Sequence, residues 1–342
     1  MKAVVIREHG GIEALRLEEI PRPVPAVDEV LVRVQAVALN HLDLWVRRGV
    51  TGVKYPLPLV PGCEVAGVIE EAGVVARGPK PGDEVVIAPG LSCGRCTECL
   101  TGEEQLCRFY GILGETRDGG CAEFVAVPAR NILPRPANLT PVQAAAMPLV
   151  FMTAWHMLVA RARLRFGEWV LVHAAGSGVG SAAIQIARLH HARVIATAGS
   201  AEKCSRAREL GADHAVDYRT TDWVAEVRRL TGKRGVDVVF EHVGADTWAG
   251  SEASLAKGGR LVICGATTGH EVTLNLRRLF FKGLSILGST MGTRGELQEV
   301  FRHASNGLLR PVVDRSLPLA AVREGHRLLE ERESFGKVVL TP

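Results

Sequence analysis

The sequence predicts an α/β protein with two domains, a mostly β domain and a domain built on a doubly wound parallel sheet. Length is the first observation, because 342 residues suggest roughly two domains at about 150 residues each. The second is that short strands and turns fill the N-terminal part of the chain. The third is that strand-like runs alternate with helical stretches after Pro141, which is typical of a parallel sheet.

The first domain is expected to consist mainly of strands. The prolines of Pro21–Pro25 exclude a helix there, because proline lacks the backbone N–H that a helix needs. The expected strands alternate or run apolar with β-branched residues, and they are Met1–Arg7, Glu29–Val37, Val65–Glu70, Glu84–Ala88 and Ala122–Val127.

The second domain is expected to begin after a helix over Val142–Ala160. Its expected strands are Glu168–His173, Arg193–Ala198, His214–Asp217, Val236–Glu241, Arg260–Cys264 and Leu284–Gly288. The tail ends in another strand, Lys337–Thr341, and does not continue the alternation, so we expect it to return to the first domain. We therefore assign 1–150 and 289–342 to the first domain and 151–288 to the second.

Composition excludes several classes of protein. The net charge is +4, from 41 basic and 37 acidic residues, which is too balanced for an electrostatic nucleic-acid binder. Hydrophobic residues at 47% exclude general disorder. No apolar run is long enough to span a membrane, and the N-terminus lacks a secretory signal, so we expect no membrane partner and a cytoplasmic location. The short basic clusters indicate solvated faces, or an anionic cofactor for one or two of them: Arg47-Arg48, Arg161/Arg163/Arg165 and Arg277-Arg278.

A glycine-rich turn follows the expected strand Glu168–His173. It contains Gly176, Ser177, Gly178, Val179 and Gly180, and a helical stretch follows directly. Glycines allow a tight turn and close approach of the backbone to a pyrophosphate, and the helix N-terminus supplies N–H groups. The turn predicts dinucleotide binding. The alternative is an ordinary glycine-rich turn in a sheet that binds nothing.

The end of the next strand indicates which dinucleotide binds. NAD sites usually carry an acid there, which holds the ribose 2′-hydroxyl. Here the strand ends Ala198-Gly199-Ser200 without an acid. Ser200 and Lys203 would suit the 2′-phosphate of NADP(H), which we favour over NAD(H). The alternative is that Lys203 is an ordinary surface residue.

Four cysteines lie within one short segment. Cys93, Cys96, Cys99 and Cys107 have the spacing C-x2-C-x2-C-x7-C, which matches a tetrahedral all-cysteine zinc site. Four thiolates leave no open position for water or substrate, so we expect one structural zinc per chain. An iron–sulfur cluster is disfavoured by the long last gap, and free thiols remain an alternative.

Taken together, these features resemble the medium-chain dehydrogenase/reductase superfamily over nearly the whole chain. The matching stretches include Pro61–Gly67, Gly82–Val85, Asp118–Glu123, Leu210–Asp213 and Gly336–Leu340. The resemblance implies a GroES-like catalytic domain with a zinc lobe, a Rossmann cofactor domain, a small-molecule substrate, and a homodimer or homotetramer.

The resemblance does not carry over a catalytic zinc site. The family's three ligands are a Cys, a His before a Glu, and a Cys or Asp. Asn40, Cys63 and Leu149 stand at these positions here, and Glu64 is kept. Three protein ligands are the usual minimum, and Cys63 alone cannot hold the metal. His41, Asp43 or His156 would help only if the loop bends unusually.

The same positions resemble the quinone oxidoreductase branch, which usually lacks zinc and has an Asn at the Asn40 position. His242–Trp248 and Asp217–Arg219 are similar to segments of that branch. The resemblance therefore implies Asn40, Cys63 and Glu64 as catalytic-site residues, with Asn40 orienting the ligand or the nicotinamide ribose and Glu64 bracing the cleft. It also implies further cofactor contacts at His41, Thr153, Tyr218, Val243, Gly244, Cys264, Gly265 and Lys337.

The function implied is NAD(P)(H)-dependent hydride transfer to or from a carbonyl, quinone or enone. Conjugated acceptors suit a site without zinc, because the developing anion is delocalised. One alternative is an alcohol dehydrogenase with an atypically held catalytic zinc. The other is a non-catalytic dinucleotide-binding protein. Lys337 is expected to contact the pyrophosphate, unless it is a solvated lysine at the end of a strand.

Overall fold

A computed structural model describes all residues from Met1 to Pro342. The chain divides into two compact units. Unit 1 contains Met1–Leu149 and Thr293–Pro342, and unit 2 contains Val150–Gly292, beside the segment 151–288 that the sequence predicted for the second domain. No helix has the length and apolar character that crossing a membrane requires.

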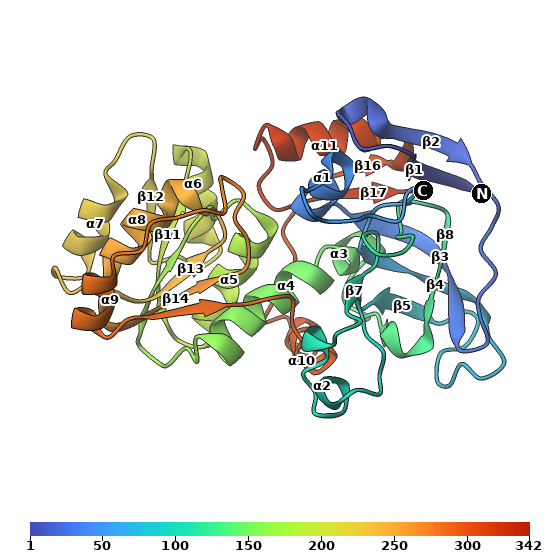
Figure 1. The fold of residues 1–342 in the computed structure, drawn as a ribbon, viewed down its shortest axis with the longest axis horizontal. Helices are drawn as coiled ribbons and strands as arrows, with labels where there is room; N and C mark the ends of the chain where they lie inside the picture. The colour runs from blue at the N-terminus through green and yellow to red at the C-terminus, as the bar shows by residue number, and fades with distance from the viewer. The chain divides into compact units, whose positions relative to one another are not determined.

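The sheet of unit 2 has six strands in the order β12-β11-β10-β13-β14-β15, and every neighbouring pair is parallel (Figure 1). This is the doubly wound order of a Rossmann domain, so the predicted fold class is confirmed. The strands are β10 Trp169–Val172, β11 Arg193–Ala198, β12 His214–Asp217, β13 Val236–Glu241, β14 Leu255–Ile263 and β15 Ser285–Gly288.

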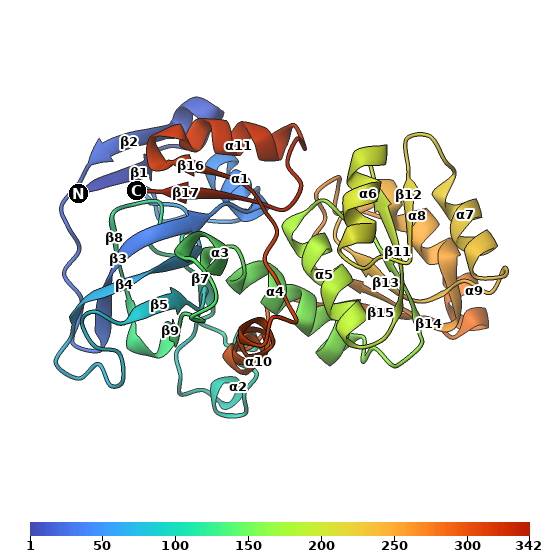
Figure 2. The same ribbon diagram turned by 180° about the vertical axis from the view of Figure 1, so that it is seen from behind.

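Winding runs in both directions from β10, which creates a switch point between β10 and β13. Right-handed crossovers then put α5 and α6 on one face of the sheet, in front of the strands in Figure 2, and α8 on the other. The helices of unit 2 are α5 Gly178–Leu189, α6 Ala201–Glu209, α7 Trp223–Leu230, α8 Ala245–Ser254 and α9 Leu276–Lys282. In open α/β sheets ligands bind beyond the carboxyl ends of the strands at such a switch point.

Unit 1 is built on a seven-stranded sheet in the order β16-β17-β3-β4-β5-β9, with β8 also paired to β3. Its strands are β3 Glu29–Ala38, β4 Glu64–Ala72, β5 Glu84–Ile87, β8 Phe124–Pro128, β9 Ile132–Pro134, β16 Val313–Pro318 and β17 Lys337–Thr341. A separate hairpin pairs β1 Lys2–Ile6 with β2 Leu15–Glu19, and a short ribbon pairs β6 Gly90–Leu91 with β7 Gly111–Ile112. Buried valine, leucine and isoleucine side chains of these strands form the core.

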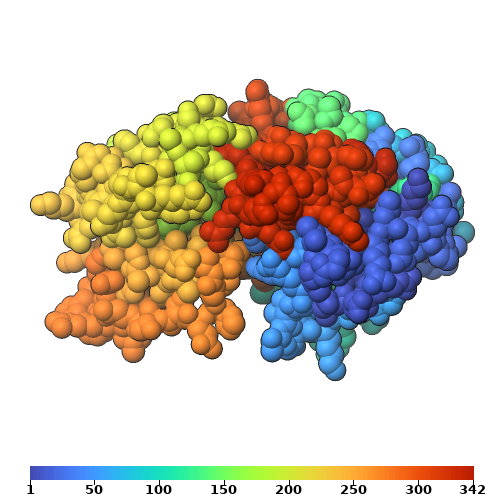
Figure 3. All heavy atoms as spheres, turned by 90° about the horizontal axis from the view of Figure 1, so that it is seen from above, coloured from blue at the N-terminus to red at the C-terminus, as the bar shows by residue number.

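The C-terminal tail belongs to unit 1. β17 pairs antiparallel with β3, and α11 Val322–Glu330 contacts the N-terminal segment, where Arg323 donates hydrogen bonds to the carbonyls of Glu13 and Leu15. Figure 3 shows this C-terminal segment lying against the N-terminal one. The other helices of unit 1 are α1 His41–Arg48, α2 Thr97–Leu100, α3 Pro141–Ala145 and α10 Arg294–Ser305.

One predicted element is wrong in detail. The continuous helix expected over Val142–Ala160 is divided into α3, α4 Pro148–Trp155 and a π-helical segment, His156–Arg161. The break falls at Ala146-Met147, before Pro148. Proline disfavours the helical conformation of the residue before it, so α3 ends there and α4 begins at the proline itself.

Candidate functional site

The four cysteines of the predicted zinc site come together in the segment between β6 and β7, which forms the zinc lobe. Their four sulfur atoms all lie within 4.8 Å of one another. Zn–S bonds of about 2.3 Å place tetrahedral sulfurs about 3.8 Å apart, and the Sγ of Cys99 lies 3.4 Å from that of Cys96 and 3.9 Å from that of Cys93. The arrangement fits a four-coordinate zinc ion.

Backbone N–H groups of the lobe point toward these sulfurs. The N–H of Phe109 donates to the Sγ of Cys107 at 3.4 Å. Hydrogen bonds from the backbone of Arg95 and Cys96 lower the pKa of the Cys93 thiol to about 6. Because the thiolate is the metal-binding form of cysteine, these dipoles suit a metal centre.

In unit 1 the start of α1 is fixed by a buried carboxylate. Asp43 accepts hydrogen bonds from the N–H of Asn40 at 2.7 Å and from the N–H of Gly62 at 2.9 Å. It therefore ties the end of β3 to the segment that enters β4. Both backbone donors are thereby satisfied inside the unit.

Asn40, which follows β3, lies beside the first residue of β4. Its Nδ2 lies 3.0 Å from Glu64 Oε2, 3.3 Å from the carbonyl oxygen of Ala38 and 3.5 Å from Cys63 Sγ, and its two protons are shared among these three acceptors. The pairing of Ala38 with Glu64 in the β3–β4 register makes this contact possible. Asn40 is only 6% exposed.

Lys337, the first residue of β17, brings a positive charge to the same place. Its Nζ lies 2.7 Å from Glu64 Oε2, 2.6 Å from the carbonyl of Leu39 and 2.5 Å from Asn40 Oδ1. The ammonium has three protons, and these three acceptors use all of them. Lys337 is 3% exposed, so its contacts favour a buried structural charge over the pyrophosphate contact expected from the sequence.

The second oxygen of Glu64 is also occupied. Glu64 Oε1 accepts a hydrogen bond from the N–H of Leu149 at 2.6 Å. Leu149 stands at the third family ligand position, so its side chain there is an alkyl group and its backbone serves the carboxylate. Burial raises the pKa of the Cys63 thiol well above its ordinary value, which keeps this sulfur protonated at neutral pH.

The glycine turn of unit 2 connects β10 to α5. Ser177 caps α5, with its Oγ accepting a hydrogen bond from the N–H of Gly180 at 2.9 Å. A Cβ on Gly180 would lie 2.5 Å from the carbonyl oxygen of Ala174, so only glycine fits. The N–H groups of Gly178 and Val179 have no acceptor within the helix, because the first turn of any helix leaves them unpaired. They fit an anionic pyrophosphate.

The end of β11 carries the residues expected to select the cofactor. Ser200 caps α6, with its Oγ accepting from the N–H of Lys203 at 3.2 Å. A Cβ on Gly199 would lie 2.7 Å from the hydroxyl of Tyr218 and 3.4 Å from Arg219 Nε. Arg219 therefore lies beside the turn, which the sequence analysis missed, although its place next to Tyr218 was visible.

Two family profiles match the chain in succession. Residues 26–137 match the alcohol dehydrogenase GroES-like domain, and residues 178–306 match the zinc-binding dehydrogenase family. An alcohol dehydrogenase of Geobacillus stearothermophilus is 34% identical over 99% of this chain and 98% of its own length. The quinone oxidoreductase of Homo sapiens is 30% identical over 99% of this chain and 97% of its own length.

A crystal structure of an NAD-dependent alcohol dehydrogenase is similar over 100% of both chains, with a TM-score of 0.97 and 54% sequence identity. The chain belongs to the medium-chain dehydrogenase/reductase superfamily. As a member of this superfamily it is an oxidoreductase, and the predicted family is confirmed.

The other predicted residues of this dehydrogenase/reductase fall into two groups. Thr153 lies buried in α4, whereas Val243 and Gly244 follow β13, and Cys264 and Gly265 follow β14 at the carboxyl edge of the sheet. In unit 1, His41 is the first residue of α1 and is exposed. Of the three residues considered as unusual metal ligands, Asp43 is held by two backbone N–H groups in unit 1, and His156 lies buried in unit 2.

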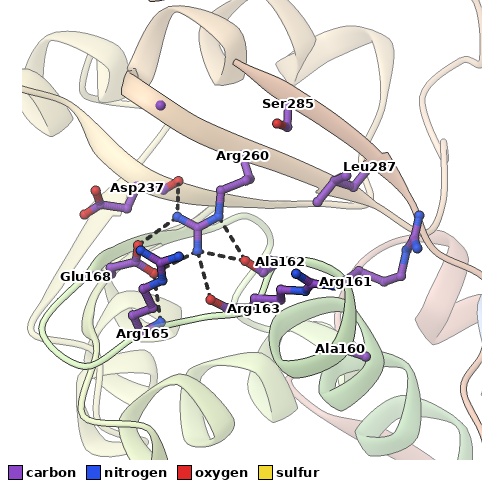
Figure 4. A pocket seen from close by; sticks show the side chains of 11 residues that line it. Ala160, Arg161, Ala162, Arg163, Arg165, Glu168, Asp237, Arg260, Ser285 and Leu287 are labelled. Carbon is purple, nitrogen blue, oxygen red and sulfur yellow. Dashed lines mark hydrogen bonds and ion pairs between the residues drawn. The ribbon is translucent and has the colours of Figure 1, made fainter. Parts of the chain in front are cut away.

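One basic cluster lies at the edge opposite the glycine turn. Arg161, Arg163 and Arg165 line a cavity of about 450 Å³ at the amino ends of the strands (Figure 4). Arg260 crosses it, donating to both carboxylate oxygens of Glu168 at 2.8 Å and to the carbonyls of Ala162 and Arg163. This clamp fixes the loop before β10, and its place at the amino edge does not suit a dinucleotide.

Another cluster is partly buried. Arg47 is nearly inaccessible, and its guanidinium contacts Glu330 of α11 and the imidazole of His326. Its neighbour Arg48 lies 2.5 Å from the same Glu330 carboxylate and is more exposed. These two arginines therefore join α1 to α11.

Asp43 should make the stability of the protein depend on pH. Burial raises the pKa of Asp43 from its ordinary value near 3.8 to about 6. Between about pH 4 and pH 6 the folded chain then holds more protons than the unfolded chain, so the free energy of unfolding falls as the pH rises through this window. In the Asp43→Asn variant, the free energy of unfolding measured by chemical denaturation should no longer fall between about pH 4 and pH 6.

The control is Asp118→Asn, because Asp118 also accepts a backbone N–H, from Val60 at 2.9 Å, but is exposed. This control should keep the wild-type dependence on pH. The same dependence in Asp43→Asn as in the wild type would contradict the assignment.

Proposed function

We propose that this protein is a zinc-containing, NAD(P)(H)-dependent oxidoreductase that transfers a hydride to or from a carbonyl, quinone or enone, with its zinc confined to the four-cysteine lobe. One observation carries the proposal. At the position of a family zinc ligand, Asn40 has both amide atoms engaged, Oδ1 with Lys337 and Nδ2 with Glu64, Cys63 and Ala38. An amide oxygen that faces the ammonium of Lys337 is a poor zinc ligand, because a metal cation there would lie beside another positive charge.

The chain's own residues can supply part of what a metal would supply. Lys337 holds a positive charge beside Asn40. Its ammonium donates to Asn40 Oδ1, and this charge-assisted hydrogen bond polarises the amide, which makes the amide N–H a stronger donor. We infer that Asn40 orients the substrate or the nicotinamide ribose, and that Glu64 holds Asn40 in place. The bound nicotinamide supplies the hydride chemistry. A quinone or enone needs less activation at oxygen than an isolated carbonyl, because conjugation spreads the developing charge.

The second candidate is an alcohol dehydrogenase with an atypically held catalytic zinc. The similarity to relatives named as alcohol dehydrogenases favours it. Of the three residues at the family's zinc-ligand positions, Cys63 is the one that could bind zinc. It would have to bind as a thiolate, and burial raises the pKa of its thiol. The quinone oxidoreductase similarity and this cost favour the first candidate.

We also propose that NADP(H) is preferred over NAD(H). No acid lies at Ala198–Ser200, and Arg219 is beside Gly199. Together with Ser200 and Lys203, this guanidinium would favour a 2′-phosphate. Because the relative at 54% identity is named as NAD-dependent, the choice has to be measured.

A homodimer or homotetramer is supported by two features of unit 2. β15 is an edge strand, with one side of its backbone open to pairing. On α9 nearby in sequence, Leu276, Phe280 and Phe281 are each about two-thirds exposed, and the two phenylalanine rings stack with centroids 4.7 Å apart. Exposed apolar surface of this kind commonly marks an interface.

The zinc proposal predicts one zinc ion per chain in the wild type. Cys99→Ser should lose the metal and lower the melting temperature by several degrees, because structural metal binding contributes folding free energy. Elemental analysis and calorimetry measure both. Cys204→Ser is the control, since Cys204 is buried in α6 and does not belong to the four-cysteine cluster, so this change should leave the zinc content unchanged. Two zinc ions per wild-type chain would support the alcohol dehydrogenase alternative.

The substrate proposal predicts turnover of quinones and enones with reduced cofactor, and much slower oxidation of simple alcohols. Asn40→Ala should lower kcat/KM for quinones by about tenfold through loss of one orienting hydrogen bond. Asn131→Ala is a matched control, because Asn131 is equally buried in unit 1 but bonds only the carbonyls of Ala88 and Gly90. It should affect stability without this loss of turnover.

Steady-state assays on a panel of quinones, enones and alcohols decide the matter. Preferred oxidation of alcohols, abolished when a second metal ion is removed, would contradict the proposal. Binding of cofactor without turnover of any class would favour a non-catalytic dinucleotide-binding protein.

The cofactor proposal predicts tighter binding of NADPH than of NADH. Arg219→Ala should weaken NADPH binding by about tenfold and leave NADH unchanged, because a charge-assisted hydrogen bond to the 2′-phosphate is lost. Fluorescence titration measures both constants. Arg193→Ala removes the same charge at the other end of β11 and should change neither. Tighter binding of NADH by the wild type would overturn the preference.

A further inference from the structure

A chain of buried polar side chains runs beneath the carboxyl ends of β10, β11 and β13. His173 directly follows β10, Thr197 is in β11 and Glu241 ends β13. Ser251 of α8 completes the chain, and each of the four residues is almost inaccessible to solvent. These strand ends border the switch point, where the topology of a doubly wound sheet places its ligand.

The direction of every hydrogen bond in this chain follows from the chemistry of one group. Glu241 is a carboxylate and can only accept, so Ser251 Oγ donates to its Oε2 at 2.7 Å. Ser251 Oγ then accepts from His173 Nε2 at 2.9 Å. Burial lowers the pKa of His173 to about 4, so the ring is neutral and carries one proton, on Nε2. Its Nδ1 accepts from Thr197 Oγ1 at 3.0 Å.

All donors therefore point the same way, from Thr197 through His173 and Ser251 to Glu241. Hydrogen bonds aligned in this manner polarise one another and strengthen the last bond, to the carboxylate. His173 Nε2 itself lies 3.8 Å from Glu241 Oε2, too far for a direct hydrogen bond. Ser251 is thus the only bridge between the imidazole and the carboxylate.

Glu241 in turn organises the segment that follows β13. Its Oε1 accepts the successive N–H groups of His242, Val243 and Gly244, at 2.9, 2.8 and 3.2 Å. The hydroxyl of Thr247 lies 3.0 Å from Oε1 and 2.9 Å from Oε2, and its one proton is shared between the two oxygens. The orientation of this single carboxylate therefore sets the backbone conformation of residues 242–244.

A dinucleotide bound at this edge has a defined course. Its pyrophosphate would lie at the turn after β10, and its adenosine ribose at the end of β11, so its nicotinamide half must extend across the switch point toward β13. Residues 242–244 directly follow β13, so they are the first residues that the nicotinamide half would contact on that side of the switch point. A second bond, between His242 Nε2 and the carbonyl of His173 at 3.0 Å, joins the two strand ends directly.

We propose that His173 and Ser251 are positioning residues for the nicotinamide half of the cofactor, acting through Glu241 on the segment 242–244. The proposal rests on the dinucleotide binding proposed above. Neither side chain touches the cofactor. They hold the Glu241 carboxylate in the orientation that fixes the backbone of residues 242–244, where the nicotinamide half would bind. Thr197 connects His173 to the end of β11, where the adenosine ribose would bind.

A matched pair of serines on α8 tests the proposal. Ser251 and Ser254 are both fully buried, but the Ser254 hydroxyl has no hydrogen-bond partner. Ser251→Ala should weaken binding of the reduced dinucleotide by about tenfold, because a hydrogen bond to a charged group is lost. Binding of an adenosine fragment, 5′-AMP or 2′,5′-ADP, should stay within about twofold, since the glycine turn and the end of β11 are unchanged. Ser254→Ala should change neither constant.

The first residue of this hydrogen-bond series, Thr197, allows a second test in which a conservative variant should restore the affinity. Thr197→Val removes the hydroxyl that donates to His173 and should also weaken dinucleotide binding, whereas Thr197→Ser keeps the hydroxyl and should restore it. Both variants should be measured by fluorescence titration of NADPH and NADH, with competition by the fragments and a melting curve for each protein.

Each outcome has a defined meaning. Wild-type dinucleotide affinity in Ser251→Ala would overturn the proposal, and so would an equal loss for the dinucleotide and the fragment, which indicates a general structural role. A wild-type protein that binds neither dinucleotide would instead overturn the proposed function. A selective loss of dinucleotide affinity in Ser251→Ala, absent in Ser254→Ala, would confirm the positioning role.

Discussion

Two opposite charges are buried together in unit 1, at the starts of two strands that flank β3. The arrangement of the site around Asn40 depends on the neutralisation of these charges by each other. Glu64 begins β4 and Lys337 begins β17, and their charged atoms lie 2.7 Å apart with almost no exposure to solvent. Removing one partner of such a pair typically costs about 3–5 kcal/mol, because the other charge is left in a medium of low dielectric constant. A slip of one residue in either strand would turn one of the side chains to the opposite face of the sheet. The register of β17, β3 and β4 is therefore tied to this ion pair.

Asn40 suits this electrostatic setting better than a metal-binding residue would. Between an ammonium and a carboxylate, a side chain that both accepts and donates satisfies the two neighbours at once, and the amide does so through Oδ1 and Nδ2. A thiolate at this position would add a second negative charge beside Glu64 and would require a cation in return. The residue type at position 40 and the charges around it are thus consistent with each other without a metal ion.

Much of the fold follows from patterns that are local in the sequence. The runs that became β11, β12 and β13 are short and flanked by helical stretches, and the structure reproduces their predicted bounds. The break at Pro148 had a visible local signal, the proline itself, which the helical composition around it outweighed. The glycine turn was predictable for the same reason, since a strand, a turn and a helix are consecutive.

The side-chain networks could not be predicted in this way. His173 and Ser251 are separated by 78 positions, and nothing in either neighbourhood indicates a contact. Lys337 could be expected at a strand start, but its partners, Glu64 and Asn40, lie almost three hundred positions away. Arg219 was assigned no role, because its place beside Gly199 depends on the pairing of β11 with β12.

Each unit contains a buried carboxylate, and the two carboxylates are stabilised by different partners. The type of partner matches the part of the structure that each carboxylate holds in place. Glu64 is paired with a cation and accepts a single backbone N–H, from Leu149, so it fixes little of the backbone around it. Glu241 receives neutral N–H and O–H dipoles, three of them from consecutive backbone positions, and such hydrogen bonds weaken steeply when their angles change. A carboxylate solvated by dipoles therefore specifies the shape of a loop, whereas one paired with a lysine secures the meeting of strands. The first suits a segment that must meet a ligand in one conformation, and the second suits the interior of a sheet.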